Sequence, residues 1–119
     1  MAVLQGQIYW VELPDQENIG KGIVHPHVVV QADELNGSRI ATTVVCALST
    51  NLEKVQWPGN VLLEPGEGNL PRQSIILVSQ VSVVDKDSLQ KPIGSLADTR
   101  VREILAGMEL QNRMREGKT

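Results

Sequence analysis

The chain has 119 residues, 41% of them hydrophobic, and it carries a net charge of −3. This length provides one domain with a real core but not two, and the ordinary hydrophobic fraction excludes a disordered chain. The balanced charge argues against a general nucleic-acid coat, which is usually basic, although a narrow binding groove depends only on local charge.

Apolar runs of strand length, separated by turn residues, follow one another along the chain. Residues 6–13 predict a first strand, and a long loop with glycines follows at 14–24, which we expect to be mobile. Further strands are predicted over ranges bounded by turn residues: 27–31, 42–48, 60–64 and 74–84. The turn dipeptide Asn36-Gly37 joins the second strand to the third, and the last run is long enough to bend or to hold two short strands. These runs predict a strongly curved small sheet or barrel, buried on both faces in places.

The C-terminal segment changes its period. Val101, Ile104, Leu105 and Met108 recur at the spacing of one helical face. Residues 95–98 resemble a capping box, with Asp in place of Glu. We therefore expect a helix over about 97–113, packed on the sheet and followed by a frayed tail at 116–119.

Other residues bound the compartment and the core. No apolar run approaches the roughly 20 residues that span a bilayer, and residues 1–4 lack the basic region of a signal peptide. Cys46 has no cysteine partner in the sequence, and its apolar strand indicates an inert buried thiol. Phenylalanine is absent, so Val, Ile and Leu must fill the core, and Trp10 is expected to join them. The sequence predicts one cytoplasmic domain over residues 1–119, without membrane contact.

The only two histidines of the sequence flank Pro26, where a glycine loop enters an apolar strand. Such a junction can present polar side chains to a ligand, and imidazoles exchange protons near neutral pH. A lone His-Pro-His carries no specific chemistry, so local features alone favour a half-exposed turn. Catalysis by His25 and His27 is the alternative.

A series of short blocks, each weak alone, resembles the MazF/PemK family of toxin endoribonucleases. The blocks are 6–13, 26–31 with Asp33, 44–51, 58–61, 70–80, 84–86 and 93–96. Together they follow the order and spacing of the family from residue 6 to about residue 108.

The resemblance implies a mainly β fold of the PemK/CcdB-like type, a small curved sheet or β-barrel with a C-terminal helix, assembled as a homodimer. It implies cleavage of single-stranded RNA at short motifs, without metal or cofactor: the ribose 2′-OH attacks the adjacent phosphate and leaves a cyclic phosphate and a free 5′-OH. It also implies a cognate MazE-like antitoxin whose tail occupies the RNA groove, with DNA reached only through that antitoxin.

The sequence departs from the family at the two central positions. The family's Arg before the proline is His25 here, and the family's Thr in the loop after the third strand is Ser49, with Thr50 beside it. Serine keeps the hydroxyl donor, but His25 lacks the permanent charge and the forked donors of Arg. An imidazole can instead act as general base or acid, and His27, two residues on, is expected on the same strand face as a partner. Candidate catalytic residues are therefore His25, Ser49 and Thr50.

Two further family positions are changed: Gly20 replaces an acidic residue and Ser82 replaces an Arg, which should weaken phosphate binding. The candidate RNA-binding residues combine cations, amides and one aromatic ring. They are Lys21, His27, Gln31, Asn51, Lys54, Trp57, Arg72 and Gln80. For each cation, and for Lys86, solvated surface charge is the competing interpretation. Trp57 either stacks on a base, worth about 1–3 kcal/mol, or folds onto the rim or a dimer contact.

Two function classes follow from these residues. The first is an active toxin that cleaves RNA and is neutralised by an antitoxin. The second is a catalytically weakened relative that binds RNA or antitoxin as a regulator. Gyrase poisoning, as in the related CcdB group, is disfavoured because that group ends in an apolar and aromatic C-terminus, whereas residues 115–119 are Arg-Glu-Gly-Lys-Thr.

Overall fold

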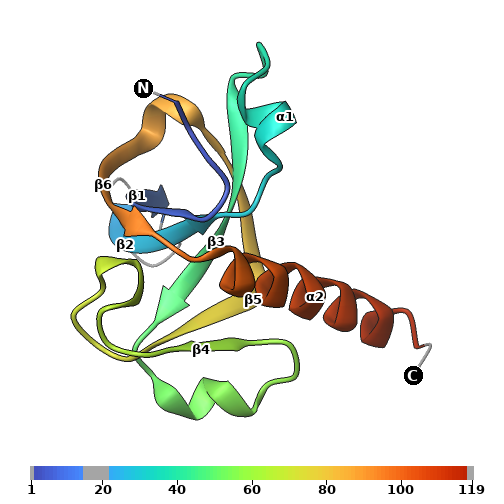
Figure 1. The fold of residues 1–119 in the computed structure, drawn as a ribbon. Coiled ribbons are helices and arrows are strands. Elements are labelled where there is room, and N and C mark those ends of the chain that lie inside the picture. Colours follow the sequence, from blue (N-terminus) through green and yellow to red (C-terminus); the bar gives the residue numbers. More distant parts are fainter. Residues whose placement is uncertain (1, 15–21, 118–119) are drawn as a thin grey trace.

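The computed structural model describes residues 2–14 and 22–117, and six strands form one antiparallel sheet in the order β4-β5-β3-β2-β1-β6 (Figure 1). The strands are β1 Gln7–Pro14, β2 Gly22–Val29, β3 Thr42–Ser49, β4 Val61–Leu63, β5 Ser74–Asp85 and β6 Leu89–Ser95. The helical elements are α1 Asp33–Asn36, η1 Leu52–Gln56, η2 Glu67–Asn69, η3 Lys86–Ser88 and α2 Asp98–Arg115. The prediction of a mainly β fold with a curved sheet and a C-terminal helix is confirmed, as an open sheet with β4 and β6 at its edges.

The second strand begins earlier than predicted, at Gly22, and runs through Pro26 to Val29. Most of the loop that we expected to be mobile, and the end of the expected frayed tail, lie outside the described residues. The β2–β3 ladder stops at the pair His27/Ala47. Because the Val30 N–H donates to the Val44 carbonyl, alternation makes Pro26/Leu48 the next hydrogen-bonding pair. Proline has no N–H to donate, so the ladder ends there and the two strands diverge.

The long fifth strand is one bent strand, which is the first of the two possibilities that the sequence left open. Its register against β3 shifts between Cys46, which faces Val81, and Ala47, which faces Leu77. Residues 78–80 therefore bulge out of the ladder. The Val78 N–H in this bulge donates instead to the side chain of Asn60, whose Oδ1 accepts the hydrogen bond at 3.1 Å.

The connection after β2 differs from the expected turn. Residues 33–36 form one helical turn, and Gly37 follows it with φ −83°, so no positive-φ hairpin turn is built at Asn36-Gly37. Asn36 is buried, and its side chain makes hydrogen bonds within the fold. Its Oδ1 accepts from Thr43 Oγ1 at 2.8 Å and from Gln31 Nε2 at 2.9 Å.

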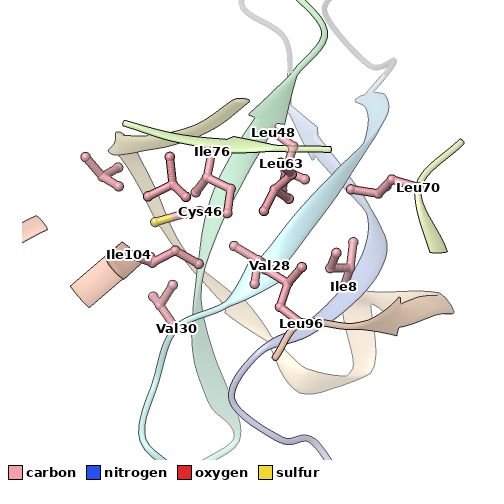
Figure 2. Packing of buried hydrophobic residues seen from close by; sticks show 12 residues of the cluster. Ile8, Val28, Val30, Cys46, Leu48, Leu63, Leu70, Ile76, Leu96 and Ile104 are labelled. Carbon is pink, nitrogen blue, oxygen red and sulfur yellow. The ribbon is translucent and has the colours of Figure 1, made fainter. Parts of the chain in front are cut away.

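Apolar side chains cover both faces of the sheet, as predicted, since neighbouring residues on one strand join different clusters. The larger cluster lies between the sheet and α2 and includes Ile8, Val28, Cys46 and Ile104 (Figure 2). The other face holds the smaller cluster, which includes Tyr9. Trp10, expected in the core, is 39% exposed, so that prediction was wrong.

The C-terminal helix spans Asp98–Arg115, close to the predicted 97–113. The predicted capping box is wrong, because the N-cap is Ala97 and no side chain caps it. Of the predicted apolar face, Ile104 is buried whereas Leu105 is 40% exposed. No helix in the described part of the chain is long and apolar enough to cross a membrane.

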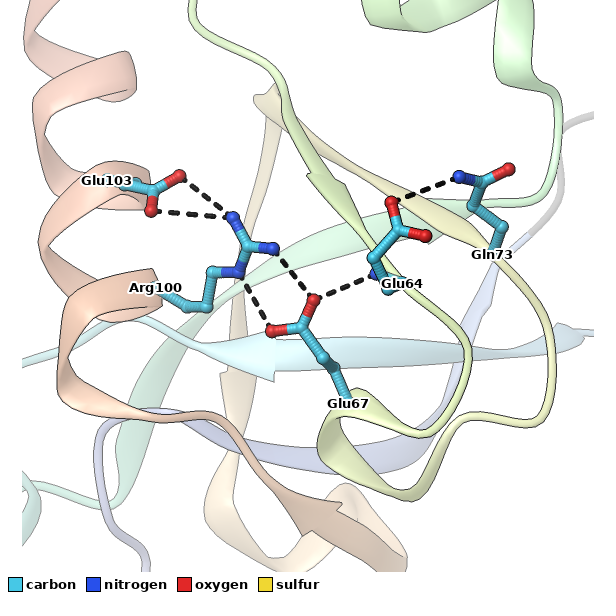
Figure 3. Close-up of polar contacts among 5 residues, drawn as sticks. All are labelled: Glu64, Glu67, Gln73, Arg100 and Glu103. Carbon is cyan, nitrogen blue, oxygen red and sulfur yellow. Dashed lines mark hydrogen bonds and ion pairs between the residues drawn. The ribbon is translucent and has the colours of Figure 1, made fainter.

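A backbone contact and an ion pair are among the contacts that hold α2 on the rest of the fold. Gly107 packs directly on the backbone of Gly59, where a side chain at either position would collide with the other segment. Near the start of the helix, Arg100 forms a two-pronged ion pair with Glu67, through Nε–Oε1 and Nη2–Oε2 distances of 2.8 Å (Figure 3). The third nitrogen of the guanidinium, Nη1, donates to Glu103 Oε2 at 3.1 Å. This ion pair lowers the pKa of Glu67.

The sixth strand was not predicted. It contains Pro92 and Gly94, which depart from the alternation of a half-buried strand, and it pairs only with β1. An edge strand tolerates both residues, because one side of its backbone carries no ladder.

Candidate functional site

A pocket of about 200 Å³ opens where β2 and β3 diverge. It is lined by His25, Pro26, Leu48, Ser49, Thr50 and Ser74. All three candidate catalytic residues of the sequence therefore lie around one cavity. The missing N–H of Pro26 is the local cause, since it ends the ladder at the point where the pocket begins.

Ser49 ends β3 and is held by the loop that follows it. Its Oγ accepts a hydrogen bond from the Asn51 N–H at 3.0 Å, and the Asn51 Oδ1 accepts one from the Glu53 N–H at 3.2 Å. Asn51 is thereby the N-cap of η1. Accepting this bond leaves the hydroxyl hydrogen of Ser49 available to donate elsewhere. Thr50, beside it, is exposed.

Ser74 belongs to the pocket although the sequence did not single it out as a site residue. It is buried, and its Oγ donates to the Arg72 carbonyl at 3.0 Å. The register Ser49/Ile75 places it beside the end of β3. A pairing of the third and fifth predicted strands would have found it. Arg72, two residues before Ser74 in the sequence, is exposed.

The two histidines occupy different environments. His25 is exposed and lines the pocket, whereas His27 is 3% exposed. Burial lowers the pKa of His27 below 6.5, and the nearby His25 adds to this, while a hydrogen bond to the His25 carbonyl opposes it. The expectation that His27 presents its ring to RNA therefore does not match this structure.

A second hollow, of about 190 Å³, lies between the end of η1, the bend of β5 and the last turns of α2. Its lining residues are Trp57, Pro58, Ser79, Gln111, Met114 and Arg115. Trp57 is 60% exposed. Gln111 links α2 to the segment after η1, because its Nε2 donates to the Pro58 carbonyl at 2.6 Å. Its Oε1 accepts a hydrogen bond from Arg115 at 3.3 Å. The helical residues were missed in the sequence because they lie beyond the predicted apolar face.

Other predicted RNA contacts lie apart from the pocket. Gln31 is past the far end of β2, where its Nε2 donates to Asn36 and to the Thr42 carbonyl. Gln80 is exposed at the bend of β5, and Lys54 is half-buried on η1. Lys21 lies outside the described residues.

Lys86 is half-buried, and its Nζ donates to the Asn36 carbonyl at 2.7 Å.

Within residues 2–14 and 22–117, no group of three or more His, Cys, Asp or Glu is placed to hold a metal ion. Cys46 is buried as predicted, and burial raises the pKa of its thiol to about 11. A thiol that stays protonated at neutral pH is a poor nucleophile.

The fold is shared with known proteins. A chain in a crystal structure of MazE–MazF from Deinococcus radiodurans is similar in fold, with a TM-score of 0.75 at 16% identity, and the match covers 96% of this chain and 98% of that one. A mycobacterial endoribonuclease in complex with its cognate antitoxin has a TM-score of 0.72 at 21% identity, covering 92% and 93%. These likenesses define the fold class as that of MazF toxins.

Sequence comparison then places the chain within a family. Residues 4–111 match the model of the PemK-like, MazF-like toxins of type II toxin–antitoxin systems. Endoribonuclease MazF6 of Mycobacterium tuberculosis is 28% identical over 108 residues, which cover 91% of this chain and 95% of the relative. Endoribonuclease MazF of Staphylococcus saprophyticus is 28% identical over 101 residues, covering 84% and 82%. The chain belongs to the PemK-like, MazF-like toxin family.

Proposed function

We propose that this protein is the toxin of a toxin–antitoxin pair and an endoribonuclease that cleaves single-stranded RNA at short motifs. One observation carries the proposal: a single pocket gathers His25, Ser49, Thr50 and Ser74 in a chain of this family. Phosphodiester cleavage needs a base near the ribose 2′-OH and donors for the phosphate oxygens. The His25 imidazole and the hydroxyl groups of Ser49 and Thr50 meet both needs without a metal ion.

In the proposed reaction, the ribose 2′-oxygen attacks the adjacent phosphorus while His25 accepts its proton. The Ser49 hydroxyl donates to a phosphate oxygen, where negative charge grows in the transition state. The bond from phosphorus to the 5′-oxygen then breaks. The products are a 2′,3′-cyclic phosphate and a 5′-oxygen that takes a proton from water.

The RNA is proposed to pass from this pocket along η1 towards Trp57. Asn51 and Lys54 lie on that route, and an exposed indole gives an unpaired base a stacking surface. Arg72, two residues before Ser74, is the candidate phosphate contact on the other side. Gln80 remains a candidate edge reader, because an amide both donates and accepts.

The proposed partners are a second copy of the chain and a MazE-like antitoxin, and the proposed compartment is the cytoplasm. DNA is reached only through the antitoxin. Solved relatives support the antitoxin, since they are described as complexes with MazE or with a cognate antitoxin. Apolar side chains on β5 support the homodimer: Val81 is 42% and Val83 69% exposed.

A second function is favoured by one residue. His25 stands where the resemblance implies an arginine, and an imidazole lacks the fixed charge of guanidinium. If that charge is indispensable, the protein is a weakened relative that binds RNA or antitoxin without cleaving. In that case His25→Arg would create an activity that the natural chain lacks.

The deciding experiment incubates the purified protein with a long single-stranded RNA, with and without EDTA. The proposal expects fragments that end in cyclic phosphate and begin with 5′-OH, formed equally in both reactions. The double variant His25→Ala, Ser49→Ala is the control for a contaminating nuclease. Absence of fragments with the natural chain, or their loss in EDTA alone, would contradict the proposed mechanism.

A further inference from the structure

His27 makes a hydrogen bond that fixes which of its nitrogens carries the proton. Its Nδ1 lies 2.9 Å from the carbonyl oxygen of His25. A carbonyl oxygen only accepts, so Nδ1 must be the donor. The ring is 3% exposed, and burial disfavours the charged form. His27 is therefore the neutral tautomer with hydrogen on Nδ1 and a bare Nε2.

The surroundings of the ring agree with a neutral state. Its neighbours across the sheet are Tyr9 on β1 and Ala47 on β3. Neither carries a charge at neutral pH, and the Tyr9 hydroxyl donates to Gln7 Oε1 at 2.8 Å. The titratable group that acts on His27 is His25, through its carbonyl and its charge.

The accepting carbonyl belongs to the residue that enters the proposed site. It is part of the peptide bond between His25 and Pro26, next to the place where the β2–β3 ladder stops. From there on, β3 no longer holds β2, so the orientation of this peptide depends on β1 and on the His27 ring. Turning the peptide would swing the Cα–Cβ bond of His25 relative to Ser49, across the pocket that both line.

We infer that His27 is a positioning residue: its buried Nδ1–H holds the His25 carbonyl and thereby aims the His25 side chain into the pocket at Ser49. This role rests on the proposed function for its consequence, but not for its geometry. His27 then touches neither RNA nor the reacting atoms. A misplacement of about 1 Å in a reacting group can cost on the order of 100-fold in rate.

Two substitutions distinguish the hydrogen bond of His27 to the His25 carbonyl from the packing of its ring. His27→Asn keeps an N–H donor at the place of Nδ1, whereas His27→Leu fills similar space without a donor. We expect His27→Leu to lower kcat by about 10- to 100-fold with KM little changed, and to shift the pH profile of kcat. His27→Asn should restore most of kcat. Thermal melting of both variants establishes that they are folded at the assay temperature.

Three outcomes would overturn the inference. Equal loss of kcat in both variants would reduce His27 to packing. A raised KM with unchanged kcat would make it an RNA contact. Unchanged kinetics in His27→Leu would remove it from the mechanism.

A measurement on the unaltered protein tests the geometry without RNA. Long-range ¹H–¹⁵N correlation spectra report which imidazole nitrogen is protonated. We expect Nδ1–H and a bare Nε2 for His27 at neutral pH. An Nε2–H tautomer would refute the hydrogen bond from His27 to the His25 carbonyl. If the protein fails to cut RNA while this tautomer is found, the proposed function has failed and the hydrogen bond stands.

Discussion

Ser49 is the side chain best placed to stabilise a phosphate, since its Oγ accepts from Asn51 and its own hydrogen is free to donate. Replacing it with alanine removes that donor. We expect Ser49→Ala to slow single-turnover cleavage by roughly 10²–10³-fold, the usual scale for one such donor, and to change binding of an uncleavable RNA little. Ser49→Thr keeps the hydroxyl and is the matched control. Full activity in Ser49→Ala and in the double variant with Thr50→Ala would remove this loop from the mechanism.

His25 distinguishes this chain from the family pattern that its sequence resembles. Imidazole side chains titrate between about pH 5 and pH 8, whereas guanidinium does not. If His25 accepts the 2′-OH proton, the cleavage rate should inflect within that range. His25→Ala should abolish cleavage, and His25→Arg should return part of it through fixed charge. A flat rate profile between about pH 5 and pH 9 would refute proton transfer by His25.

His27 should make folding stability sensitive to acid. Its pKa in the folded chain is lowered below 6.5, chiefly by burial, so the unfolded chain binds its proton more readily. Stability therefore rises with pH between the folded value and 6.5, and it is lost as the pH falls below 6.5. Urea unfolding at about pH 5 and about pH 8 measures this difference. It should shrink in His27→Asn but persist in His25→Asn, and an equal difference in all three proteins would exclude His27 as its source.

At the scale of elements, the position of α2 depends on a contact between two backbones. A methyl group at Gly107 would meet the carbonyl of Gly59, which cannot retreat as a flexible side chain would. Alanine is the better helix former by about 1 kcal/mol, but overpacking costs about 1–3 kcal/mol. We expect Gly107→Ala to lower the free energy of unfolding by about 1–2 kcal/mol, measured by urea denaturation. Ala106→Gly, on the exposed side, is the comparison, because it loses helix propensity alone; a more stable Gly107→Ala would contradict the contact.

The sequence predicted those elements that an apolar run or a helical apolar spacing marks. β1, β3 and α2 were found within a few residues of their bounds because apolar spacing marks them. β6 was missed because Pro92 and Gly94 are tolerated only at an edge, and edges are decided by the whole sheet. The helix start was predicted to within a residue, but its capping box was wrong because such a cap needs local geometry that Ser95, within β6, does not have.

The candidate site shows the same division. His25 and Ser49 were chosen through the family resemblance, but only strand pairing brings them to one pocket. Ser74 depends on the register between β3 and β5, which no local pattern contains. His27 shares a strand with His25, yet its burial depends on the strands on both sides.

At the scale of the whole molecule, β5 presents an unfinished surface. β4 pairs with it only over Ser74–Ile76, so one edge of its second half has no strand partner among the described residues. On that half, Val83 is 69% exposed and Val81 42%, on a strand that carries few charges to blunt association. An apolar edge of this kind invites pairing with another chain, and a second copy of the same chain is the partner that the proposed function provides.

We therefore expect a homodimer whose interface includes the second half of β5. Sedimentation at micromolar concentration should give about twice the 13.0 kDa of one chain. Val83→Asp should shift the protein towards monomer, because it buries a charge against apolar surface. Val55→Asp, at a site 43% exposed on η1, is the matched control and should leave the dimer intact. A natural chain that sediments only as a 13.0 kDa species would refute the dimer, and equal dissociation by both substitutions would move its interface away from β5.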